Sequence, residues 1–134
     1  MIASSAKVAG DDGRTRDKDA IADRRTIDVE HLKRMTLGDG RLEREVLQIF
    51  VRQSAMMLER ISSGQPGVIV TAAHTLLGSA RGIGAWRVAD AAERLERASR
   101  EACEIEIGNA TAELKAASLE ATAAIGARLG EPSH

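Results

Sequence analysis

The stretch from Ile69 to Trp86 reads IVTAAHTLLGSARGIGAW and contains one histidine, His74. Apolar residues recur within it at alternating steps of four and three, at positions 69, 73, 76, 80 and 83. This spacing lines up one face of a helix, so we expect that face to be buried. A rotation of about 100° per residue places His74 nearly opposite the middle of the buried face. The imidazole is therefore predicted to point into solvent.

Three residues that follow His74 share its surroundings on this helix. Gly78 falls on the same outer face one turn on and Arg81 two turns on. Leu77 is expected at the edge between the outer face and the core. An exposed histidine beside a residue without a side chain is a place where another protein can approach closely.

The segment from His74 to Ala85, HTLLGSARGIGA, closely resembles the phosphorylation motif of histidine-containing phosphotransfer (HPt) domains. The segments 42–53 and 85–96 are similar to the second and fourth helices of that family. In all, the resemblance covers about residues 27–128. It implies that His74 accepts a phosphoryl group on Nε2 from the phosphoaspartate of a receiver domain.

The resemblance also implies how the work is divided between the two proteins. The receiver domain, of a hybrid histidine kinase and/or a response regulator, supplies the phosphoaspartate, a Mg²⁺ ion and a Lys, so no cofactor of the chain's own is expected. Gly78 lets the receiver approach, and Ser79 is expected to hydrogen-bond locally. Gln53 interrupts a buried stripe and has two interpretations. It is either a boundary residue bonded to water or backbone, or a partner of His74 or its phosphoryl group.

One position departs from the family pattern. HPt domains usually carry a Lys three residues after the phosphorylated His, and here that residue is Leu77. Leu77 is expected to dock on the receiver's hydrophobic patch instead. Arg81 is expected to take some of the missing Lys role, because it lies on the His74 side of the helix and is always charged. It lies about 10 Å away along the axis, so its side chain must fold back.

Length and composition indicate a single helical domain. The chain has 134 residues, 43% of them hydrophobic, with one Phe, one Trp and no Tyr, so Ala and aliphatic side chains must fill the core. A net charge of −1 gives no reason to expect binding to nucleic acid or an anionic membrane. The single cysteine, Cys103, excludes an internal disulfide. No apolar stretch resembles a membrane span or signal peptide, so we expect a cytoplasmic protein.

Turn and cap signals divide the chain into a disordered N-terminal arm, residues 1–25, and a domain at 26–130. The domain is predicted to be an all-α, antiparallel up-down four-helix bundle with an additional short N-terminal helix, and a monomer. The predicted helices span about 27–37, 40–62, 66 to 82 or 84, 85–103 and 109–129, with caps at Thr26, Asp39 and Asn109.

Periodicity also assigns the faces of these helices. His31 is interpreted as a solvated surface residue, and Glu96 as part of a solvated charged face. The buried side of the helix at 40–62 is expected to comprise Leu42, Val46, Ile49, Phe50, Met56, Met57 and Ile61.

Three functions are compatible with these features. The first is a phosphorelay intermediate acting through His74, and the second an adaptor that binds a receiver without efficient transfer. The third is a helical bundle with an unrelated binding role. The motif favours the first. A hydrolase or metalloenzyme is disfavoured because His31, His74 and His134 are scattered and no HExxH occurs. No ATP-binding region is present, so a phosphotransfer intermediate is expected rather than an ATP-dependent kinase.

Overall fold

The computed structural model describes residues 26–130, and these contain five complete α-helices and no strand. The all-α prediction is therefore confirmed for this part of the chain. The arm predicted at residues 1–25 lies outside the described residues, as does His134. The helices are α2 (Val29–Met35), α3 (Gly40–Ser62), α4 (Pro66–Ile83), α5 (Trp86–Arg100) and α6 (Glu104–Leu129).

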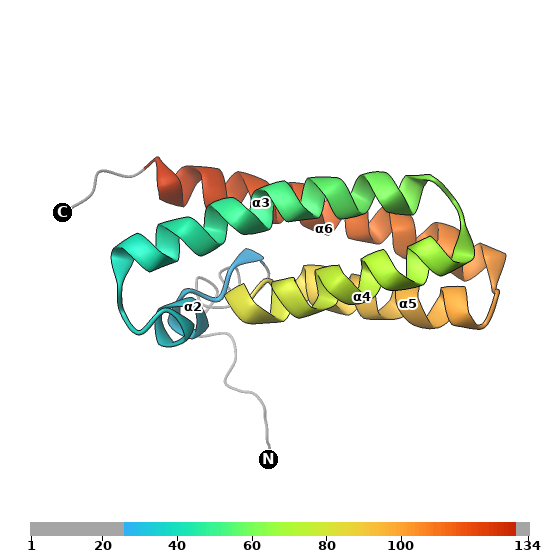
Figure 1. Cartoon of the computed structure of the whole chain (residues 1–134), viewed down its shortest axis with the longest axis horizontal. Helices are drawn as coiled ribbons and strands as arrows, with labels where there is room; N and C mark the ends of the chain where they lie inside the picture. The colour runs from blue at the N-terminus through green and yellow to red at the C-terminus, as the bar shows by residue number, and fades with distance from the viewer. Residues whose placement is uncertain (1–25, 131–134) are drawn as a thin grey trace, which may run out of the picture.

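The four long helices enclose one hydrophobic core. Helices α3 and α5 each pack against both α4 and α6, so the four close into a ring around the core. Figure 1 shows them side by side, with α2 at the end of the bundle where α3 begins and α4 ends. Within residues 26–130, no helix is both long enough and apolar enough to cross a membrane.

Several helix ends follow the sequence signals. Asp39 caps α3, because its carboxylate accepts hydrogen bonds from the backbone N–H groups of Arg41 and Leu42 at 2.9 and 3.1 Å. Pro66 occupies the first turn of α4, where its missing N–H costs nothing. Gly84 ends α4 in the left-handed conformation, with φ of 82°. Pro66 and Gly84 therefore define the two ends of α4, the helix that carries His74.

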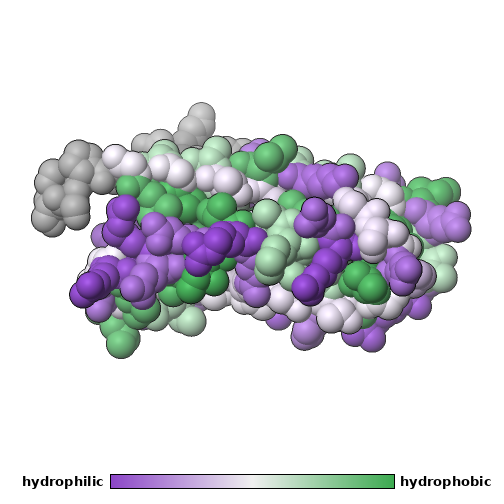
Figure 2. Space-filling view, turned by 45° about the horizontal axis from the view of Figure 1, so that its top comes forward, coloured by the Kyte–Doolittle hydropathy of each residue, from purple (hydrophilic) through white to green (hydrophobic). Residues whose placement is uncertain are grey.

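The buried face of α3 differs from the one expected. Leu42, Ile49 and Met56 are exposed rather than buried. These three residues recur every seven positions and form a row next to the buried residues of the helix. Because both rows are apolar, hydrophobicity alone does not show which of them is buried. In Figure 2, hydrophobic side chains reach the surface as separate patches among hydrophilic ones. The residues that α3 buries are Leu47, Phe50, Ser54, Met57 and Ile61.

Two helix starts and one surface histidine also differ from expectation. Helix α2 is capped by Asp28 rather than Thr26, and α6 begins at Glu104, before the expected cap Asn109. His31 is not simply solvated. Its Nε2 lies 2.8 Å from the carbonyl oxygen of Arg81, and its ring packs against Trp86 with a centroid distance of 4.9 Å. His31 therefore helps hold α2 against the end of α4.

We expect Gly84→Ala to destabilise the fold by about 2 to 3 kcal/mol, because it combines a positive φ with overpacking. A Cβ at Gly84 would lie 2.9 Å from the Cβ and 3.0 Å from the carbonyl oxygen of Asp28. Thermal or urea unfolding measures the loss. Gly82→Ala is the matched control, since a Cβ there meets nothing within 4 Å. Equal stability of the two variants would contradict the close packing of Asp28 on Gly84.

Candidate functional site

His74 lies on the outer face of α4, and its side chain is 72% exposed. The opposite face is buried at each position of the predicted stripe. The predicted outward orientation of the imidazole is therefore confirmed. The buried stripe consists of Ile69, Ala73, Leu76, Ala80 and Ile83.

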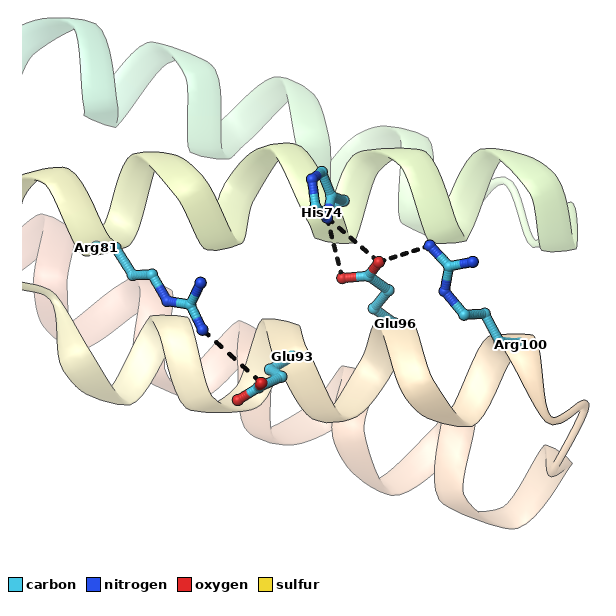
Figure 3. A network of polar contacts seen from close by, with 5 residues as sticks. All are labelled: His74, Arg81, Glu93, Glu96 and Arg100. Atoms are coloured by element: carbon cyan, nitrogen blue, oxygen red, sulfur yellow. Dashed lines mark hydrogen bonds and ion pairs between the residues drawn. The ribbon is translucent and has the colours of Figure 1, made fainter.

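The His74 ring rests on a carboxylate from the neighbouring helix. Its Nδ1 lies 3.3 Å from Oε1 and 3.2 Å from Oε2 of Glu96 on α5. Figure 3 shows the two side chains meeting across the seam between α4 and α5. Glu96 is only 12% exposed, so it is sheltered beneath the much more exposed ring. The expectation that Glu96 belongs to a solvated face is wrong.

Glu96 also receives a second donor. Nη2 of Arg100, one turn further along α5, lies 2.8 Å from Oε2 of Glu96. This hydrogen bond lowers the pKa of Glu96 below its ordinary value of 4.5, with a smaller contribution from His74, while burial acts in the opposite direction. The carboxylate is therefore ionised at neutral pH and can only accept hydrogen bonds. Nδ1 of His74 therefore acts as the donor to it, which in the neutral form of the ring leaves the lone pair on Nε2.

Arg81 lies apart from this cluster. Its Nη2 is 3.7 Å from Oε2 of Glu93, and both side chains are largely exposed. The two α4 side chains, His74 and Arg81, thus each face a different glutamate of α5. The structure does not bring Arg81 to the imidazole.

Gln53 and Ser79 form a pair of their own. The Ser79 hydroxyl donates a hydrogen bond to Oε1 of Gln53, which joins α3 to α4. Gln53 thus has a direct partner in Ser79. Ser79 was expected to hydrogen-bond locally within its helix. Instead, its hydroxyl bonds to a residue of a different helix. The pair links the two helices beside the His74 face.

Leu77 is buried, at 6% exposure, and belongs to the hydrophobic core. The prediction that it lies at the edge of the outer face, available to a partner, is therefore wrong. The reason is that α4 packs against both α3 and α5, so its buried face is wider than one stripe. The Leu77 side chain therefore contributes to core packing and is not presented to a partner.

Gly78 lies one turn beyond His74 and is exposed. A Cβ built there would meet no atom within 4 Å, so neither packing nor backbone conformation demands glycine. The gap beside the imidazole is open to solvent.

Sequence reasoning missed Glu96 and Arg100. Their i, i+4 spacing is a signal for an ion pair, but this spacing is common on solvated helices. Only the rotation of α5 against α4 shows that the pair lies under His74. Within residues 26–130, no group of three His, Cys, Asp or Glu side chains is placed to hold a metal ion.

One of three comparisons with known proteins found a match. The Hpt domain family model matches residues 45–124, which include His74, Glu96 and the seam between α4 and α5. Neither the search of curated proteins nor that of solved structures found a match. The family match covers more than half of the chain. The chain therefore belongs to the family of histidine-containing phosphotransfer (HPt) domains, which take part in two-component phosphorelays.

Proposed function

We propose that the protein is a phosphorelay intermediate: His74 accepts a phosphoryl group from the phosphoaspartate of one receiver domain and passes it to another. The observation that carries the proposal is the exposed imidazole whose Nδ1 rests on the sheltered Glu96 carboxylate. This contact leaves the lone pair on Nε2 for attack on phosphorus. Membership of the HPt family supports the same role.

The transfer can be followed bond by bond. The Nε2 lone pair attacks phosphorus, and the bond from phosphorus to the aspartate oxygen breaks, returning its electron pair to the carboxylate. The ring keeps its Nδ1 proton and becomes cationic, which the ionised Glu96 stabilises. In onward transfer a carboxylate oxygen of the second receiver's aspartate attacks phosphorus, the N–P bond breaks with its electrons returning to Nε2, and the ring leaves as neutral imidazole. No proton has to enter or leave the ring in either direction.

The remaining chemistry is assigned to the receiver. Phosphoryl transfer depends on in-line positioning and on neutralising charge, so a helix face that presents one oriented acceptor is a sufficient contribution. The receiver brings the aspartate, Mg²⁺ and a Lys, as the family resemblance implies. We propose that the chain acts without a cofactor of its own and does not phosphorylate itself from ATP.

We also propose that a receiver domain docks on the surface around His74. The open backbone at Gly78 lets the receiver come close to His74. Exposed Ile49 on α3 lies with Ser79 along the groove between α3 and α4, and it offers apolar contact in place of buried Leu77. The short connections between successive long helices support an antiparallel up-down order, which presents this face on one side of a monomer.

The alternative is an adaptor that binds a receiver without efficient transfer, which the Leu at position 77 favours. The test is to mix the protein with a receiver domain that has been phosphorylated by acetyl phosphate. An acid-labile, base-stable phosphate on His74 supports the relay. A stable complex without phosphate on the protein would favour the adaptor instead.

Replacing Glu96 with Gln should slow phosphoryl uptake from a receiver by roughly tenfold, which corresponds to about 1.4 kcal/mol. The amide preserves the shape but not the charge that stabilises the cationic ring. Quenched time courses at neutral pH measure the rate of phosphoryl uptake, with Glu93→Gln as the matched control. Unchanged kinetics in the Glu96 variant would remove this carboxylate from the mechanism.

The effect of Glu96→Gln on the free energy of unfolding should depend on pH. The hydrogen-bond donors of Glu96 lower its pKa below the ordinary value of 4.5. The ionised carboxylate therefore stabilises the fold at pH values above 4.5. This contribution is lost as the pH falls through the lowered pKa. The difference in free energy of unfolding between wild type and Glu96→Gln should therefore be present at pH 7 and shrink in acid.

A further inference from the structure

The guanidinium group of Arg100 and the His74 ring contact the same carboxylate oxygen of Glu96. Nη2 of Arg100 is 2.8 Å from Oε2 of Glu96, and Nδ1 of His74 is 3.2 Å from that same oxygen. Figure 3 shows Arg100 reaching from α5 toward the carboxylate on the side away from Arg81. The Arg100 side chain is 62% exposed, so packing does not fix it in this one conformation.

Phosphorylation would change the charge balance of this cluster. With a neutral ring, the single charges of Glu96 and Arg100 compensate each other. A phosphoryl group on Nε2 adds up to about two negative charges across the ring from Glu96, and these repel the carboxylate unless a cation screens them. A guanidinium carries five N–H donors, so it can bond a carboxylate at one edge and phosphoryl oxygens at another.

The other positions considered for this cation are less suitable. Position 77 holds a buried leucine that faces the core. Arg81 lies seven residues beyond His74, about 10 Å along the axis, and is paired with Glu93. Arg100 alone of the three candidates already shares a hydrogen-bonding atom with the ring.

We infer that Arg100 binds the phosphoryl oxygens of phosphorylated His74 and so replaces the lysine that the family usually carries at position 77. The inference rests on the proposed function, because it needs the phosphorylated form. Arg100 acts on the phosphoryl group directly, in addition to holding Glu96.

The test uses the small donor phosphoramidate, which requires no receiver. After phosphorylation of the full chain, the ³¹P signal of His74 is titrated with pH. Arg100→Ala should raise the pKa of this titration by about 0.5 to 1 unit, since a nearby cation favours the more anionic form and solvent weakens the effect. Arg100→Lys should recover part of the shift. Arg97→Ala, which removes an exposed arginine of the same helix, should leave the pKa unchanged.

A second comparison separates direct contact from support of Glu96. In a Glu96→Gln background, Arg100→Ala should still raise the ³¹P pKa if the guanidinium touches the phosphoryl group. No shift in that background, or a shift in Arg81→Ala instead, would overturn the inference while leaving the proposed function intact. A wild-type protein that takes up no phosphoryl group on His74 would overturn both.

Discussion

Replacing His74 with Gln should abolish phosphoryl uptake, from a receiver domain and from phosphoramidate alike. Glutamine has no ring nitrogen with a nucleophilic lone pair, and removal of a nucleophile typically lowers rates at least about 1000-fold. The side chain is 72% exposed, so the fold should be nearly unchanged, within about 0.5 kcal/mol. Incorporation of ³²P, with circular dichroism as a check on folding, measures both quantities.

His31→Gln is the matched control for this result. His31 contacts the backbone of Arg81 and the Trp86 ring, so its loss should cost some stability but no phosphoryl uptake. Equal labelling of wild type and the His74 variant would mean that the phosphate resides elsewhere. The role assigned to the exposed imidazole would then be wrong.

Replacing Gly78 with Gln should separate the two kinds of phosphoryl donor. Because a Cβ at this position meets no atom within 4 Å, the longer side chain must extend into the space that a receiver would occupy. Displacing reacting atoms by about 1 Å can cost about 100-fold in rate, so transfer from a receiver should fall by roughly that factor. Labelling by phosphoramidate, which is small, should stay within about twofold.

Two further variants sharpen the Gly78 experiment. Gly78→Ala should stabilise the helix by about 0.5 to 1 kcal/mol, because glycine is a poor helix former and nothing here requires it. Gly108→Gln places the same side chain on α6, exposed and without contacts, and should not affect transfer. If Gly78→Gln accepted phosphate from a receiver at the wild-type rate, close docking over this helix turn would be excluded.

The parts of the fold that the sequence predicts are those set by local chemistry. Asp39 caps α3 and Gly84 ends α4 because side-chain oxygens and positive φ angles act within a few residues. The start of α6 was missed because Ala102, with φ of 54°, turns the chain without a glycine and the helix resumes at once. Asn109, which looked like a cap, lies inside that helix.

For the site, periodicity places His74 correctly because a single helix determines its exposure. Leu77 and Glu96 were misplaced because their surroundings depend on how α4 packs against two neighbours. Likewise, the bond from Ser79 to Gln53 joins residues on different helices, and spacing within one helix cannot reveal it. Helix rotation in the bundle is therefore the information that a single sequence lacked.

The atom that carries the phosphoryl group can be located by NMR. Protein labelled with ¹⁵N in histidine is phosphorylated by a receiver, and the imidazole nitrogens are examined by ¹H–¹⁵N and ³¹P NMR. We expect a phosphorus bonded to Nε2 of His74 and a proton retained on Nδ1, next to Glu96. A phosphorus on Nδ1, on another residue or on none would contradict it.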